Sequence, residues 1–254
     1  MRIKSAIYEV THPLLRMIRS SHFLIRRIFG VRIPQGLSVA YDPTTIALSR
    51  TLNRIVTEQD RRSFEMGVGQ AALVSLSMRH HNHLELHGAD CSSARVQSST
   101  TAAQHNDRAV SFVESDLFSN VPDGDEFDLI FFNVPYVPRD QGRKLQLTKR
   151  LDVDGDQVWD GGVDGTEVLA RFLQEAGDYL SDTGRLVFGV QNIFVSDERV
   201  CEVLEETGWE LMERSRIRFV PSCCYIVRPK AIESPDADTN QHVESSSLTA
   251  AASL

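Results

Sequence analysis

Residues 127–138 read Phe-Asp-Leu-Ile-Phe-Phe-Asn-Val-Pro-Tyr-Val-Pro. The run up to Phe132 is apolar apart from one aspartate, and Asn133 and two spaced prolines follow at once. An apolar run of this length, bounded by turn residues, predicts a buried central strand of a parallel sheet. Ligands of open α/β sheets bind beyond the carboxyl ends of such strands. Asn133 and Tyr136 are therefore candidate site residues, with the alternative that Asn133 only begins an Asn-x-Pro turn.

Alternating strand-like and helix-like segments lie on both sides of this central strand. The predicted strands cover residues 64–66, 84–90, 110–113, 127–132, 184–190, 209–219 and 223–227. The predicted helices cover residues 43–58, 72–78, a polar stretch that ends near 106, 166–180 and 197–207. Asp42 has the position of a helix N-cap, with Pro43 in the first turn. This alternation predicts an α/β, Rossmann-like fold with a seven-stranded, mostly parallel sheet and helices on both faces.

Composition divides the chain into three parts. Residues 1–38 contain six arginines and one lysine against a single acid, Glu9, and we interpret them as a short, basic, helical N-terminal extension. An organellar presequence, a membrane-surface helix and an RNA-facing patch are alternatives for this part. Residues 39–229 form the main domain. Residues 230–254 have scarcely any large apolar side chains and are expected to be a disordered tail.

Bulk properties narrow the class of protein. The chain has 254 residues, 41% hydrophobic content and a formal net charge of −8, which argues against coating nucleic acid by charge alone. The four cysteines lack the spacing of zinc ligands, so no metal site is expected. No apolar run reaches the roughly 18 residues that a transmembrane helix needs, and a reduced, cytoplasmic protein fits best.

A glycine-rich loop and three acids point to a cofactor site. Gly67 and Gly69 follow a predicted strand, where glycine allows the backbone to approach a ligand closely. Glu65 ends that strand, Asp90 ends the second and Asp116 follows the third. Each acid alone could be an ordinary loop acid or helix cap. Acids at the tips of three successive strands favour a cationic nucleoside with a ribose diol over a dinucleotide, whose pyrophosphate Glu65 would repel.

Together with the Asn133–Tyr136 segment, the glycine loop and the three acids make the sequence resemble the class I S-adenosylmethionine-dependent methyltransferases of the Asn-Pro-Pro-Tyr branch. The resemblance runs from about residue 39 to 228 and is greatest to the protein-(glutamine-N5) methyltransferases that modify release factors. The residues that carry it are Gly88-Ala89-Asp90, Asp116-Leu117-Phe118, Phe127-Asp128-Leu129-Ile130, Asn133-Val134-Pro135-Tyr136-Val137-Pro138 and Gly161-Gly162-Val163-Asp164-Gly165.

The resemblance implies S-adenosylmethionine as cofactor and a role for each matching residue. Glu65 would face the methionine ammonium, Gly67 and Gly69 would lie beneath the methionine, and Asp90 would bind the ribose. Asp116 and Leu117 would surround the adenine, and Asn133 would border the cofactor. In the catalytic signature Asn133, Pro135 and Tyr136, the asparagine would bind the target amino group and the tyrosine would stack on its plane.

The chemistry of the signature follows from the poor nucleophilicity of a planar nitrogen, whose lone pair is delocalised. Two acceptors aimed at its hydrogens, Asn133 Oδ1 and the Val134 carbonyl, would stabilise the charge that develops during transfer. The sequence departs from the family at Val134, which replaces the first proline and loses its fixed φ. Ala71 replaces the last glycine of the cofactor loop.

Several functions stay open at this point. The first is an N-methyltransferase acting on an amide nitrogen, with a release-factor-like protein glutamine as substrate. The second is an adenine-N6 methyltransferase acting on RNA or DNA, with the basic N-terminus binding the strand. The third is a catalytically silent, methyltransferase-like subunit that binds a partner, and a small partner subunit could also complete an active enzyme. A nicotinamide dehydrogenase is disfavoured by Glu65.

Overall fold

The computed structural model describes residues 21–39, 41–151, 155–218 and 222–230. The expectations for residues 1–20 and for the tail from residue 231 onward lie outside this part of the chain. Within it, no helix is both long enough and apolar enough to cross a membrane.

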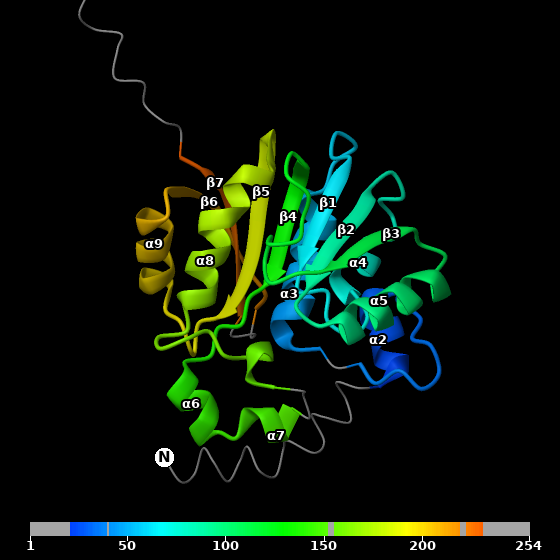
Figure 1. Ribbon diagram of the computed structural model, residues 1–254, viewed down its shortest axis with the longest axis horizontal. Helices are drawn as coiled ribbons and strands as arrows, with labels where there is room; N and C mark the ends of the chain where they lie inside the picture. The colour runs from blue at the N-terminus through cyan, green and yellow to red at the C-terminus, as the bar shows by residue number, and fades with distance from the viewer. Residues whose placement is uncertain (1–20, 40, 152–154, 219–221, 231–254) are drawn as a thin grey trace, which may run out of the picture.

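The predicted sheet of seven strands is confirmed. Its strand order is β3-β2-β1-β4-β5-β7-β6. The first five strands in the order pair in parallel, and β7 is antiparallel to both β5 and β6. On one side of the β1–β4 pair the chain runs outward through β2 to β3, and on the other it runs through β5 to the edge strand β6 and returns to β7 between them (Figure 1). The strands are β1 (Arg62–Met66), β2 (Glu85–Asp90), β3 (Val110–Glu114), β4 (Phe127–Asn133), β5 (Leu180–Gln191), β6 (Trp209–Arg216) and β7 (Ser222–Pro229).

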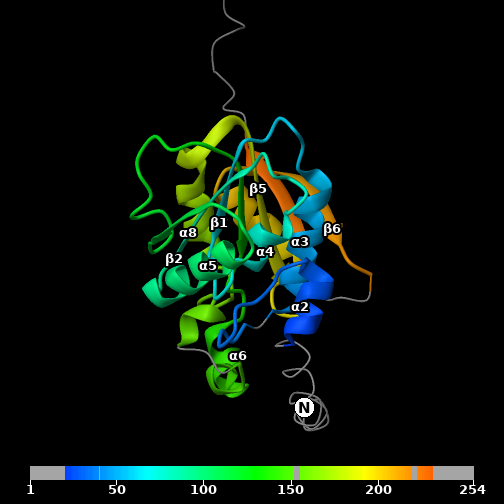
Figure 2. The ribbon, with the colours of Figure 1, turned by 90° about the vertical axis from the view of Figure 1, so that its right-hand side faces the viewer.

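Helices cover both faces of the sheet, as predicted. One face packs against α2 (His22–Phe29), α3 (Pro43–Ile55), α4 (Leu73–Ser77) and α5 (Ser93–His105), and the other packs against α8 (Glu167–Ala176) and α9 (Asp197–Glu206). Figure 2 shows α3 and α8 on opposite sides of the strands. Within the described part of the N-terminal extension, α2 contributes Ile25 and Phe29 to the core.

Two hydrophobic cores follow from strand alternation. Along β4, Ile130 and Phe132 join the core beneath α8 and α9, whereas Leu129 and Phe131 join the core beneath α3. Side chains of successive strand residues point to opposite faces, so an uninterrupted apolar run supplies both cores at once. The same rule places the adjacent Cys223 and Cys224 in different cores, and both are buried.

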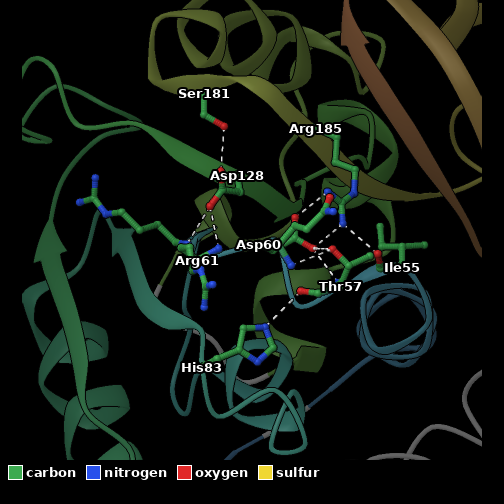
Figure 3. Close-up of polar contacts among 10 residues, drawn as sticks. Ile55, Thr57, Asp60, Arg61, His83, Asp128, Ser181 and Arg185 are labelled. Carbon is green, nitrogen blue, oxygen red and sulfur yellow. Dashed lines mark hydrogen bonds and ion pairs between the residues drawn. The ribbon is translucent and has the colours of Figure 1, made fainter.

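The amino-terminal ends of the central strands are tied together by a polar cluster (Figure 3). Arg185 of β5 forms two hydrogen bonds to Asp60, at 2.7 and 3.0 Å, and a third to the Ile55 carbonyl at the end of α3. Asp128 of β4 accepts hydrogen bonds from two backbone N–H groups at the start of β1 and from the Ser181 hydroxyl of β5. This cluster lies at the end of the sheet opposite to Asn133.

The connection between Arg139 and Val163, in which the sequence pattern predicted no helix or strand, contains helical turns. These are α6 (Arg139–Lys144), α7 (Leu147–Leu151) and the 3₁₀ turn η1 (Asp156–Val158). Helices this short depend on tertiary packing, and Gly142 provides it by lying against the Trp159 ring, where a Cβ atom would come within 2.0 Å of the ring. The sequence pattern does not predict such a contact.

Candidate active site

Glu65, Asp90 and Asn133 lie at one edge of the sheet, at the carboxyl ends of neighbouring strands. Glu65 of β1 pairs with Gly88 of β2 on one side and with Phe131 of β4 on the other. Asp90 and Asn133 each lie two residues further along their strands. The parallel register therefore brings these sequence-predicted residues together, as the position rule for α/β sheets requires.

The loop after β1 depends on its two glycines. Gly67 and Gly69 have φ values of +69° and +62°, which favour glycine over other residues. A Cβ atom on Gly67 would lie 2.8 Å from the Phe132 ring, while nothing lies within 4 Å of the corresponding position on Gly69. The open space beside Gly69 leaves room for a ligand to approach this backbone closely.

Asp90 connects the loop to the end of β2. Its Oδ2 accepts a hydrogen bond from the Gly69 N–H at 3.0 Å, and its Oδ1 accepts one from the Ser92 N–H at 3.1 Å. The Arg95 guanidinium lies 3.4 Å from Oδ1, and Asp90 is only 3% exposed. Because each carboxylate oxygen accepts about two hydrogen bonds, Oδ2 keeps an acceptor position beyond those made within the described chain.

Glu65 is buried, 5% exposed, and accepts a hydrogen bond from the Ser75 N–H at 3.0 Å. Burial in the low-dielectric interior raises the pKa of its carboxyl group to about 8, against the lowering effect of the Ser75 N–H. The negative charge of Asp90 contributes a further rise. A cation placed beside this carboxyl group would stabilise its ionised form and lower its pKa.

Asp116 and Leu117 follow β3. Asp116 is largely exposed and forms an ion pair with Arg171 of α8 at 3.2 Å. Leu117 is buried in a left-handed conformation with φ of 49°. Glu114 pairs with Asp90 in the parallel register of β2 and β3, and the Ser115 N–H donates to the Asp90 carbonyl at 2.9 Å, so Asp116 lies next to the end of β2.

Asn133 ends β4 with one half of its side chain bonded and the other half free. Its Nδ2 lies 3.2 Å from Asp42 Oδ1 and 3.3 Å from Thr45 Oγ1. Its Oδ1 is shielded from solvent and has no hydrogen-bond partner among the described residues. A buried acceptor without a partner costs about 1–3 kcal/mol, and such atoms in native proteins call for an explanation.

Tyr136 is buried, with its hydroxyl donating to Asp42 Oδ2 at 2.6 Å and its ring stacked on Phe194 at a centroid distance of 6.0 Å. Pro135 contributes its carbonyl to the packing of the Gly161–Gly165 stretch, since a Cβ atom on Gly161 would lie 2.7 Å from that oxygen. The signature and the glycine-rich stretch at residues 161–165 thus pack against each other.

Asp42 is the site residue that sequence reasoning missed. The Asp-Pro-Thr-Thr pattern identified it correctly as the N-cap of α3, where its Oδ1 accepts from the Thr45 N–H at 2.8 Å. Its contacts to Asn133 and Tyr136 span 91 and 94 residues of sequence. No local pattern signals a contact at that separation.

The described residues contain no group of three or more histidine, cysteine, aspartate or glutamate side chains arranged to hold a metal ion. His83, from the histidine-rich stretch at 80–83, instead contacts the Thr57 carbonyl and lies 3.4 Å from Glu58.

Comparison with known sequences shows that the chain is similar to methyltransferases. Residues 39–155 match the methyltransferase small domain family. A Methanocaldococcus jannaschii protein, provisionally named a protein N5-glutamine methyltransferase, is 29% identical over 195 residues, covering 77% of this chain and 93% of that protein. The release factor glutamine methyltransferase of Haemophilus influenzae is 26% identical over 199 residues, covering 73% of this chain and 66% of that enzyme.

Comparison with solved structures gives the same fold. A methyltransferase from Pyrococcus furiosus superimposes with a TM-score of 0.59 at 15% sequence identity, covering 87% of this chain and all of that one. At this identity the likeness concerns the fold alone, and it confirms the Rossmann-like methyltransferase architecture.

Proposed function

The chain is an S-adenosylmethionine-dependent methyltransferase, and we propose that it methylates a planar amide nitrogen, the side-chain amide of a glutamine in a protein. The cofactor supplies an electrophilic methyl group on a sulfonium. The work left to the chain is to hold the cofactor, to orient the amide and to stabilise the charge that develops on its nitrogen.

The observation that carries this proposal is the free Oδ1 of Asn133. An amide –NH₂ has two hydrogens and a delocalised lone pair. Hydrogen bonds from that group to Asn133 Oδ1 and to the Val134 carbonyl become stronger as the nitrogen acquires positive charge, so they favour the transition state over the ground state. An acceptor that the protein leaves without a partner is suited to this task, since the substrate itself supplies the missing hydrogen bond.

The residues at the tips of β1 and β2 fit the cofactor. In the proposal, Asp90 Oδ2 accepts from the ribose hydroxyls, and Glu65 faces the methionine ammonium. Gly67 and Gly69 allow the backbone to lie beneath the methionine, as their positive φ values and the open space above Gly69 support. Asp116 and Leu117, which lie next to the end of β2, would surround the adenine.

The named activities of the relatives support a protein as the substrate. Both relatives described above carry glutamine methylation in their names. The match to the archaeal protein covers nearly its whole length, whereas about a third of the Haemophilus enzyme has no counterpart here. The site is therefore proposed to act on a glutamine, with the release factor of the same source organism as the first substrate to test.

The test is to identify the methylated product. The purified protein is incubated with S-adenosylmethionine labelled in its methyl group, together with that release factor or, in parallel, with adenine-containing RNA. Digestion and mass spectrometry then locate the label. We expect N5-methylglutamine in the protein and no label in the RNA. Label in N6-methyladenine, or no transfer by a folded protein that binds the cofactor, would refute the proposal.

A further inference from the structure

Asp42 touches both polar side chains of the signature with a single carboxylate. Its Oδ1 lies 3.2 Å from Asn133 Nδ2, and its Oδ2 accepts from the Tyr136 hydroxyl at 2.6 Å and lies 3.5 Å from Gln191 Nε2. From these contacts we propose that Asp42 is a positioning residue for methyl transfer, which fixes the orientation of the Asn133 amide and the placement of Tyr136. The inference rests on the function proposed above and assigns Asp42 a task beyond capping α3.

The capping task uses only part of the Asp42 carboxylate. Oδ1 accepts from the Thr45 N–H at 2.8 Å and from the Thr45 hydroxyl at 2.7 Å, and the Asp42 N–H donates to Thr45 Oγ1 at 3.3 Å, which completes the capping box of α3. Among the described residues, the hydrogen bonds that Oδ2 accepts come from outside the helix. Both of its donors, Tyr136 and Gln191, belong to segments that follow β4 and end β5. The second oxygen is therefore committed to the site and not to the start of the helix.

The direction of each hydrogen bond determines which way the Asn133 amide faces. An ionised carboxylate only accepts hydrogen bonds. The Thr45 hydroxyl donates its hydrogen to Asp42 and so presents a lone pair to Asn133. Both neighbours therefore require the –NH₂ half of Asn133 on their side, and a rotated amide would place Oδ1 against a carboxylate oxygen. The unpartnered Oδ1 is thereby held on the opposite side, in the orientation that a substrate amide needs.

Tyr136 is fixed by the same carboxylate. Its hydroxyl also lies 3.3 Å from Thr44 Oγ1, which in turn lies 3.1 Å from Ser222 Oγ at the start of β7. Phe194 stacks on the Tyr136 ring. The backbone between Asn133 and Tyr136 carries Val134 where a proline would restrict φ. Anchoring the side chains at both ends of this turn to one half-buried carboxylate offsets that loss of backbone restraint.

The test compares Asp42→Ser with the wild-type protein. Serine is a good N-cap, so α3 retains its start, but its short side chain cannot reach Asn133 and Tyr136 together. At saturating S-adenosylmethionine we expect the single-turnover rate of glutamine methylation to fall by about 10- to 100-fold, the range typical of a misplaced catalytic group. The Kd for the cofactor, measured by calorimetry, should be unchanged. Ser21→Ala, which removes the N-cap of α2, is the control for a simple loss of helix stability.

A second readout does not require an acceptor substrate. The side-chain –NH₂ signals of Asn133 are assigned in the ¹⁵N NMR spectrum by their absence from Asn133→Asp, and their hydrogen exchange is measured. We expect exchange to be faster in Asp42→Ser and in Thr45→Val than in the wild type, because both variants remove an acceptor from Nδ2. Asp42→Asn, which retains one acceptor oxygen, should be intermediate.

The two readouts separate failure of this inference from failure of the proposed function. A wild-type methylation rate and wild-type exchange in Asp42→Ser would overturn the positioning inference and leave glutamine methylation standing. Absence of glutamine methylation by the wild type, with faster exchange in Asp42→Ser, would overturn the proposed function and keep Asp42 as the residue that orients Asn133.

Discussion

At the residue scale, Glu65 is a carboxylic acid that the fold keeps out of water. Its pKa of about 8 lies above the ordinary value of 4.5, chiefly because burial disfavours the charged form. Between these two pH values the folded protein binds a proton that the unfolded chain releases. The contribution of Glu65 to stability is therefore fully present below about pH 4.5 and is lost as the pH rises toward 8.

Replacing the Glu65 carboxyl by an amide should reveal this cost. Glu65→Gln retains an oxygen that can accept from the Ser75 N–H but has no charge to bury. We expect the free energy of unfolding of this variant, relative to that of the wild type, to be larger (the variant relatively more stable) at about pH 8.5 than at about pH 5. Urea denaturation at the two pH values measures the difference. A difference that is equal at both, or larger at the lower pH, would show that Glu65 is not protonated in the fold.

Cofactor binding should draw the proton off Glu65. A methionine ammonium beside the carboxyl group favours its charged form, so binding near neutral pH should release protons. Titration calorimetry in two buffers of different ionisation enthalpy counts the protons released. We expect release by the wild type and none by Glu65→Gln. Equal proton counts for the two proteins would place the ammonium elsewhere.

At the scale of elements, the two glycines in the loop between β1 and α4 allow the cost of backbone strain to be compared with the cost of a steric clash. Gly67 and Gly69 both have positive φ, so alanine costs about 1–2 kcal/mol of conformational energy at either position. Only at Gly67 would the added methyl also meet the Phe132 ring, at 2.8 Å. We expect Gly67→Ala to lower the free energy of unfolding more than Gly69→Ala does, as measured by urea denaturation. The reverse order would contradict the described packing of β4 against this loop.

Element positions follow from sequence wherever one period of hydrophobicity persists. The β4 run and the alternation around it predicted all seven strands and their parallel core, because burial on both faces demands continuous apolar segments. The turns α6 and α7 were missed because short helices have little pattern of their own and are held by contacts such as that of Gly142 with Trp159.

At the scale of the whole molecule, the two ends of the sheet do different work. The carboxyl end carries Asn133 and the acids that we propose bind the cofactor, and the amino end carries the ion pair of Asp60 and Arg185. Burial alone would raise the pKa of Asp60, but hydrogen bonds from Arg185 and Thr57 lower it below its ordinary value. Asp60 therefore stabilises the fold above the ordinary pKa of aspartate, and this stabilisation is lost as the pH falls through its folded pKa.

Disrupting the polar cluster at the amino-terminal ends of the strands should lower the stability of the fold without changing cofactor binding. Asp60→Asn removes the negative charge and leaves Arg185 without its partner, which for buried pairs typically costs about 3–5 kcal/mol. We expect a loss of that order in urea denaturation at neutral pH, with the Kd for S-adenosylmethionine unchanged below the transition. A weakened Kd in the folded variant would show that the two ends are coupled.

The sequence predicted which residues gather at the carboxyl end but not how they are held there. Glu65, Asp90 and Asn133 were identified because each ends a strand, and parallel register then fixes their proximity. Asp42 was recognised only as a helix cap, since its contacts with Asn133 and Tyr136 depend on where α3 packs against the sheet. Topology determines the membership of such a site, and tertiary packing determines its hydrogen bonds.

The central claim is that Asn133 provides the acceptor that activates a substrate amide. The most direct measurement is the single-turnover rate of methyl transfer to the release-factor glutamine at saturating S-adenosylmethionine, for wild type, Asn133→Ala and the surface control Asn82→Ala. We predict a loss of about 10²- to 10³-fold for Asn133→Ala, the range for removal of one transition-state hydrogen bond, and no loss for the control. A wild-type rate in Asn133→Ala would contradict the account.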